Sequence, residues 1–305
     1  MTHSCFPYSL QISSACYHLD SVALDLMKVS SQTELSEVQI WMSLIEKASS
    51  LKTLHLYRGL DNSDFEVSKA YLESFKHLKT LENLTIDLTC SFSEPSNQTL
   101  SKMSFTHLSS LANLKSLDLT LSCWTDHPGF RNIKVLQSLS KLEQLCLDLS
   151  DCSNIDSTFL RNLALILPSL YELKRFKLFL PTSGIPHEGR IALFSSFKQL
   201  YQLKDLYLNL KKARLDHTIM RILCNNLAHL NLTSLKIIQE GQPQKPKSLL
   251  QRLPAFWEYE QRLTSLFSAL YGFNSLESLS LDLSVFEIST KEFKHFSLAL
   301  KELNC

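Results

Sequence analysis

Residues 142–149 read Leu142-Glu-Gln-Leu145-Cys-Leu147-Asp-Leu149, and this stretch decides the fold of the chain. Its last three leucines alternate with other residues, which is the two-residue period of a strand with one buried face. A polar turn follows, and residues 158–170 then place Phe159, Leu163 and Leu167 at helical spacing. The stretch therefore predicts a strand, a turn and an amphipathic helix that covers the strand.

The same leucine phrase returns along the chain with a period near 30 residues. Its starts are Leu51, Leu81, Leu114, Leu142, Leu173, Leu203, Leu232 and Leu276, and an early copy begins at Leu19. The intervals between the eight starts are 28 to 33 residues, except for a last interval of 44. Such a period is typical of a repeat protein, in which stacked strand–helix units share one continuous core.

The phrase resembles the leucine-rich repeat family, specifically its long ribonuclease-inhibitor-like class. The resemblance covers residues 19–305 and implies an α/β leucine-rich repeat solenoid, a horseshoe with parallel strands on the concave face and helices on the convex face. We expect a lead-in or cap over residues 1–18 and a repeat domain over residues 19–305, with about nine repeats. An inserted loop at residues 239–259 accounts for the long interval.

The repeats depart from the family pattern at the end of the strand. Several carry another inward leucine, such as Leu121, Leu149 and Leu180, which predicts a strand longer by about one pair of residues. Soon after the strand stand Cys90, Cys123 and Cys152, near the place where the family has a buried ladder of Asn or Cys. We assign these cysteines to that ladder rather than to redox or metal sites.

Composition places the chain among folded proteins without a strong electrostatic field. Hydrophobic residues make up 44% and charged residues 20%, and the net charge of +1 would not gather nucleic acid or an anionic membrane. The chain shows no signal-peptide pattern and no apolar run near the roughly 20 residues of a membrane helix. Its eight cysteines are scattered, which favours reduced thiols. We expect a cytoplasmic protein, and a place in the cytoskeleton or another large assembly is compatible with the sequence.

Sequence motifs of catalysis and cofactor binding do not occur. The chain has six glycines and contains no Gly-rich phosphate loop, His-Glu-x-x-His pair or Gly-x-Ser-x-Gly elbow. Cys123 and His127 are close in sequence but have no second pair at a matching spacing. We therefore expect no enzyme activity, no cofactor, no metal and no small-molecule substrate.

The residues between the inward leucines should form the concave face. Its first half brings acidic residues, including Asp118 and Asp148, and the following repeats bring Arg175, Lys177 and Lys236. Between them lie Phe179, Tyr207 and Asn209 on neighbouring strands. Aromatic side chains flanked by charges suit a protein contact. The alternative is a solvated face with incidental aromatics.

The inserted loop is the second candidate for function. It begins with a stretch rich in Pro, Gln and Lys and continues to Phe256, Trp257 and Tyr259. Insertions in repeat proteins often lie on the binding face, and three large aromatic side chains need cover. They either fold back on the solenoid or dock into a partner.

These features predict a non-catalytic interaction scaffold, adaptor or structural subunit that binds a protein partner and neither nucleic acid nor membrane. The resemblance also includes activators of small GTPases and substrate receptors of ubiquitin ligases, which are the alternatives. At the C-terminus, Leu300-Lys-Glu-Leu303 resembles the start of another copy. That edge is either covered by a partner, or the stretch finishes the last helix.

Overall fold

The computed structural model describes residues 20–25, 43, 47–48, 50–57, 73–87, 105–121, 128–150, 152, 155–181, 185–210, 216–239, 263–283, 288 and 290–303. The chain forms two compact units, Met1–Cys152 and Ser153–Cys305, which we call unit 1 and unit 2. In the described part, nine strands follow one another in chain order with helical segments between them, and within each unit neighbouring strands are parallel. The chain is thus an α/β protein with a repeated strand–helix pattern.

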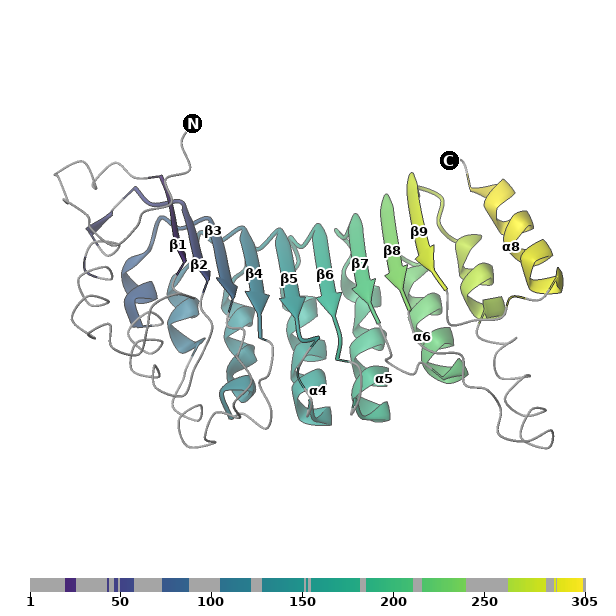
Figure 1. Cartoon of the computed structure of the whole chain (residues 1–305), viewed down its shortest axis with the longest axis horizontal. Helices are drawn as coiled ribbons and strands as arrows, with labels where there is room; N and C mark the ends of the chain where they lie inside the picture. The colour runs from purple at the N-terminus through teal and green to yellow at the C-terminus, as the bar shows by residue number, and fades with distance from the viewer. Residues whose placement is uncertain are drawn as a thin grey trace. The chain divides into compact units, whose positions relative to one another are not determined.

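Unit 1 contains five strands, and each pairs with the next one along the chain. They are β1 (Ser21–Asp25), β2 (Thr53–Tyr57), β3 (Asn83–Asp87), β4 (Ser116–Thr120) and β5 (Gln144–Asp148) (Figure 1). Equivalent residues of the leucine phrase are register partners, as for Leu54, Leu84 and Leu117. The early copy is confirmed, because β1 lies within it.

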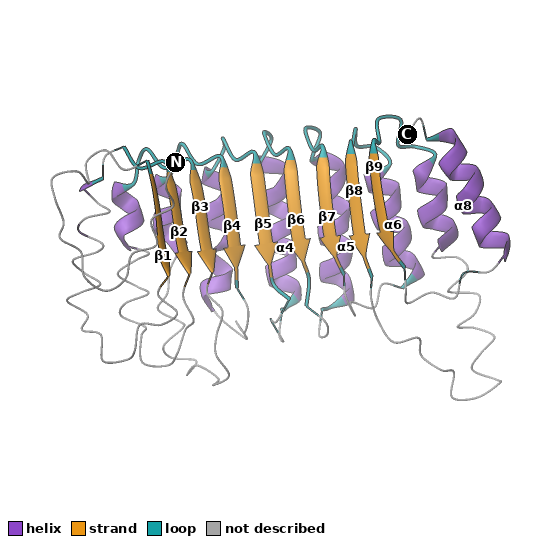
Figure 2. Ribbon diagram, turned by 45° about the horizontal axis from the view of Figure 1, so that its top comes forward, coloured by secondary structure: helices purple, strands orange, loops and turns teal. Residues whose placement is uncertain are grey.

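Unit 2 contains four strands in the same arrangement, β6 (Arg175–Phe179), β7 (Asp205–Asn209), β8 (Ser234–Ile238) and β9 (Ser278–Asp282). Its helices are α4 (Ser157–Ile166), α5 (His187–Ser196), α6 (His217–Leu227) and α8 (Thr290–Glu302), and residues 263–270 are also helical. Figure 2 shows α4, α5 and α6 on one face of the strands. The opposite face carries no described helix.

Leucine side chains fill the space between the strands and the helical segments. From β2 to β8 the inward residues of the strands are no more than 4% exposed, and Phe176 of β6 is fully buried. Phe197 packs edge-on against both Phe176 and Phe194, at centroid distances of 5.9 and 5.6 Å. Burial of the alternate strand residues confirms the two-residue period predicted from the sequence.

The helix predicted over 158–170 is observed as α4 followed by the 3₁₀ turn η5 (Leu167–Ser169). Asp156 caps α4, because its side chain accepts a hydrogen bond from the backbone N–H of Phe159 at 2.7 Å. Pro168 stands in the first positions of η5 and has no N–H to continue the α-helical ladder. A buried Gly189 lets α5 approach α4, since a Cβ there would lie 2.9 Å from Cδ1 of Leu160.

Unit 1 differs from the predicted amphipathic helices. Its described connections include the 3₁₀ segments η2 (Phe75–His77), η3 (Phe105–Ser110) and η4 (Pro128–Ser138). Serine hydroxyls bond carbonyls three residues back, from Ser109 to Thr106 and from Ser138 to Val135. The same bonds occur at Ser169 and Ser196 beside the α-helices of unit 2, so they do not distinguish the two helix types. The segment η3 is rich in residues of low helix propensity, which disfavours an α-helix there.

The extra inward leucine extends the backbone ladder without lengthening the strand proper. The strands end one residue earlier, but Leu121 N–H donates to Asp148 O and Leu180 N–H to Asn209 O, both at 2.9 Å. Both leucines are 2% exposed. At the other end of the repeats, Leu300 lies inside α8, so the C-terminal phrase finishes the last described helix.

Candidate protein-binding face

The face of unit 2 opposite the helices consists of the outward residues of β6 to β9, and we call it the strand face. The strand register arranges these residues in three rows. The first row is Arg175, Asp205, Ser234 and Ser278. The second is Lys177, Tyr207, Lys236 and Ser280. The third is Phe179, Asn209, Ile238 and Asp282.

Two aromatic rings pack together on this face. The ring centroids of Phe179 and Tyr207 are 5.0 Å apart, with planes inclined by 36°. The prediction that they form one aromatic patch is confirmed. Both residues are half-buried, so the pair presents apolar surface while part of it is covered by neighbouring residues.

A lysine completes the aromatic cluster. The ammonium of Lys236 lies 5.3 Å from the centroid of the Tyr207 ring, within the range of a cation–π contact. Tyr207 is the register partner of Lys236 on one side and of Lys177 on the other. The middle row therefore places one aromatic ring between two exposed cations.

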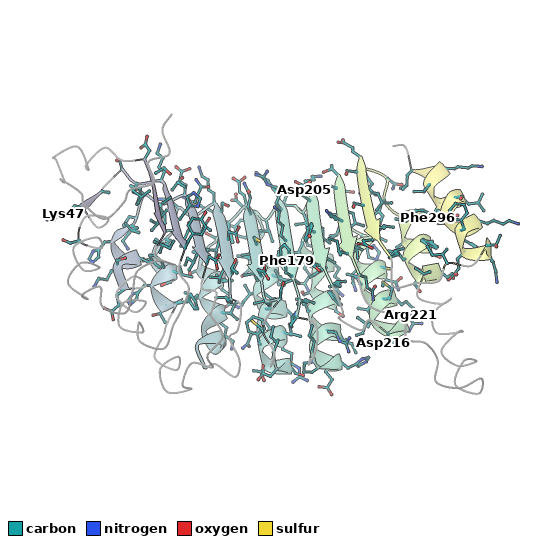
Figure 3. The ribbon with its side chains drawn as sticks, in the orientation of Figure 1. Lys47, Phe179, Asp205, Asp216, Arg221 and Phe296 are labelled. Carbon is teal, nitrogen blue, oxygen red and sulfur yellow. The ribbon has the colours of Figure 1, made fainter. Side chains whose placement is uncertain are left out.

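The outer rows carry a more balanced charge. Arg175 is the register partner of Asp205, whose carboxylate accepts a hydrogen bond from Thr233 Oγ1 at 3.4 Å. In the third row Asn209 stands beside Phe179, and Asp282 is the single charge. Figure 3 shows Phe179 and Asp205 in the strand layer, whereas Asp216 and Arg221 lie with α6. Positive charge in excess is thus concentrated on Lys177 and Lys236.

The predicted acidic residues belong to unit 1 and stand at different register positions of the neighbouring strands β4 and β5. Asp118 lies in the middle of β4 and is the register partner of Thr85 and Cys146. Asp148 ends β5, and its carboxylate accepts a hydrogen bond from Ser150 N–H at 2.9 Å. That bond stabilises the turn after the strand, which gives Asp148 a local structural role.

Several predicted site residues lie outside the described part of the chain. These are Phe256, Trp257 and Tyr259 of the inserted loop, together with Cys90 and Cys123 of the predicted ladder. The loop follows β8 directly, and its first residue, Gln239, is 4% exposed. The alternatives given for this loop therefore stay predictions.

Cys152, the one cysteine of the predicted ladder that lies in the described residues, is buried, as that prediction requires. Cys152 is 0% exposed, and its thiol donates to the backbone carbonyl of Leu121, 2.7 Å away. Cys146, Cys152 and Cys224 are all free of disulfides. Burial raises the pKa of the Cys224 thiol to about 12, so this thiol stays neutral and unreactive.

Exposed apolar residues that the sequence interpretation missed occur at two other places in unit 2. Tyr171 and Tyr201 are 61% and 74% exposed, and each stands two residues before the first leucine of its phrase. Phe293 of α8 is 59% exposed, and Leu279 and Leu281 of β9 are only half-buried. The matching positions of the two tyrosines were a signal visible in the sequence, whereas the exposure near β9 was not.

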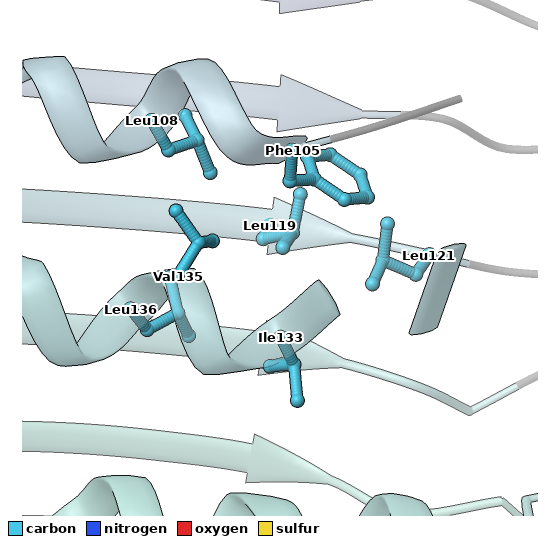
Figure 4. Close-up of a pocket in the computed structure, with 7 residues that line it drawn as sticks. All are labelled: Phe105, Leu108, Leu119, Leu121, Ile133, Val135 and Leu136. Carbon is cyan, nitrogen blue, oxygen red and sulfur yellow. The ribbon is translucent and has the colours of Figure 1, made fainter. Parts of the chain in front are cut away.

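We also searched the described residues for pockets, metal-binding groups and membrane-spanning helices. A small pocket in unit 1 is lined by seven apolar side chains, among them Phe105, Leu119 and Ile133 (Figure 4). Within the ranges that the structure describes, no group of three His, Cys, Asp or Glu side chains could hold a metal ion. No helix in those ranges is long and apolar enough to cross a membrane.

No protein-family model matches the chain, and no curated protein matches its sequence significantly.

Proposed function

We propose that this chain is a leucine-rich repeat solenoid of the long, ribonuclease-inhibitor-like class, with its strands on a concave face. The leucine period, the aligned parallel strands and the buried thiol of Cys152 support this assignment. In such a solenoid the inward strand residues are buried in the core, and the outward strand residues can contact a partner.

The proposed function is that of a non-catalytic scaffold, adaptor or structural subunit that holds another protein on the strand face. The observation that carries it is the cluster of Phe179, Tyr207 and Lys236 on a face without a described helix. Rigid aromatic rings supply contact area at a low cost in conformational entropy, and neighbouring charges orient the partner. The loop predicted over 239–259 follows β8 in the chain, and we propose it as a second contact for the partner.

Charge reversal on the strand face tests this function. Full-length protein carrying Arg175→Glu and Lys177→Glu should lose its partners in quantitative co-purification from cells that natively express it. Both side chains are exposed, so the folded state should be retained, as checked by thermal unfolding. The matched control is Lys198→Glu with Lys291→Glu, two exposed lysines on helical segments, which changes the net charge by the same amount. Equal partner sets for wild type and the strand-face variant would refute the function.

A further inference from the structure

We propose that the middle row of the strand face binds an acidic, extended segment of the partner protein, an inference that rests on the function proposed above. The segment crosses β6, β7 and β8, and its carboxylates contact Lys177 and Lys236. Between them, an apolar side chain packs against Phe179 and Tyr207.

Charge complementarity selects an acidic ligand. Lys177 and Lys236 are exposed, and among the described residues neither forms an ion pair with a carboxylate. Arg175, by contrast, has Asp205 as its register neighbour, which offsets its charge. The middle row has two cations and no acid, so it is the place on this face where carboxylates gain most.

Strand spacing selects an extended chain. Lys177 and Lys236 are register neighbours of the same residue, Tyr207, and therefore stand two strand spacings apart. That separation is roughly 10 Å, because parallel strands lie about 4.8 Å apart. Side chains of an extended segment point alternately to opposite sides, so acids at positions i and i+4, about 13 Å apart, face the strands together with an apolar residue at i+2. The long, flexible side chains of glutamate and lysine accommodate the difference between this spacing and that of the strands.

The aromatic pair selects an apolar side chain between the acids. Tyr207 lies between the two lysines in register and packs against Phe179 at 5.0 Å. The cation–π contact with Lys236 holds that ammonium beside the ring. An apolar group placed there covers aromatic surface while its acidic neighbours approach the lysines.

The charges around the middle row favour a peptide over a nucleic acid as its ligand. In the outer rows Asp205 offsets the charge of Arg175 and Asp282 is the single charge, so neither row adds positive charge that would attract a run of phosphates. The net charge of +1 gives no long-range attraction for a polyanion. A short segment with its acids confined to the middle row avoids both aspartates.

Fluorescence anisotropy with synthetic ligands tests the inference on the full-length protein. The probes are a fluorescein-labelled peptide of Glu and Leu with one central Phe, the same peptide with Gln in place of Glu, and a labelled oligo-dT of similar length. The acidic peptide should bind and the Gln peptide should not. Binding of the acidic peptide should weaken as salt rises from low to high concentration, because exposed charge pairs are screened.

The decisive variant is Lys177→Gln with Lys236→Gln, which should weaken binding about tenfold, as expected for the loss of two exposed charge pairs. The control Lys198→Gln with Lys291→Gln should leave it unchanged. The inference is overturned if the acidic peptide does not bind, if both double variants weaken its binding equally, if the Gln peptide binds as tightly, or if oligo-dT binds more tightly.

The co-purification test separates the two proposals. If the Arg175→Glu and Lys177→Glu protein loses its partners while the wild type does not bind the acidic peptide, the scaffold function is retained and the acidic ligand is rejected.

Discussion

The ring of Phe179 on β6 packs against the ring of Tyr207 on β7, with a centroid distance of 5.0 Å. Aromatic pairs in such tilted contact contribute about 0.5–1.5 kcal/mol beyond the area they bury. The pair therefore stabilises the strand face as well as forming part of it.

This contact predicts an energetic coupling between the two residues. Urea unfolding of Phe179→Leu, Tyr207→Leu and the double variant should give a coupling free energy of about 0.5–1.5 kcal/mol. Tyr171 is exposed and precedes β6, so Phe179→Leu and Tyr171→Leu should be additive within about 0.5 kcal/mol. Additivity of the Phe179 and Tyr207 effects would contradict the observed packing.

The thiol of Cys152 predicts a second stability effect. Cys152→Val keeps an apolar side chain but removes the donor to Leu121 O, leaving a buried carbonyl without this bond. We expect a loss of about 1–3 kcal/mol in the free energy of unfolding, measured by urea denaturation. Cys146→Val, on the half-buried outward side of β5, should cost less. Equal stability of Cys152→Val and wild type would exclude a structural role for the bond.

Cysteine labelling should follow burial and pKa. Iodoacetamide reacts with thiolates, and the pKa of about 12 leaves Cys224 almost fully protonated at pH 8. Peptide mass spectrometry should therefore find Cys146 alkylated in the native protein and Cys224 alkylated only after denaturation. The raised pKa also makes stability depend on pH. The thiol ionises near pH 9 in the unfolded chain and near pH 12 in the folded protein, so the free energy of unfolding should be constant below pH 9 and fall between pH 9 and 12. Equal native labelling rates at the two sites would contradict the burial of Cys224.

The N-cap of α4 predicts a graded series at position 156. Asp156→Ala removes the acceptor for Phe159 N–H and should cost about 0.5–2 kcal/mol in thermal or urea unfolding. Asp156→Asn keeps an acceptor oxygen and should cost less. A larger loss for Asn than for Ala would show that the carboxylate acts through something other than the cap.

The sequence predicted the strands better than the connections between them. Each strand coincides with a leucine phrase, because burial of alternate residues is a strong local constraint that Leu145 and Leu147 already display. The 3₁₀ segments of unit 1 were not predicted, although η3, with Thr106, Ser109 and Ser110, is rich in residues of low helix propensity. Helical spacing alone does not distinguish these turns from an α-helix.

The repeat also made part of the candidate site predictable. Parallel register follows from the repeat, so the proximity of Phe179 and Tyr207 could be inferred from equivalent positions. The side-chain directions that place Lys236 over Tyr207, and Asp148 on the backbone of Ser150, depend on rotamers and local turns. For the charges, the sequence predicted only that acidic residues precede basic ones along the strands, whereas the structure shows a row in which Tyr207 lies between Lys177 and Lys236.

Site-specific photo-crosslinking tests the central claim, that a protein partner lies on the strand face, most directly. Benzoylphenylalanine would replace Lys177 in one full-length protein and the exposed Tyr201, on the turn before β7, in another, each expressed in the native cells. A discrete protein adduct should form from position 177 and none from position 201. An adduct from position 201 with none from position 177 would show that the partner binds elsewhere and would refute a partner on the strand face.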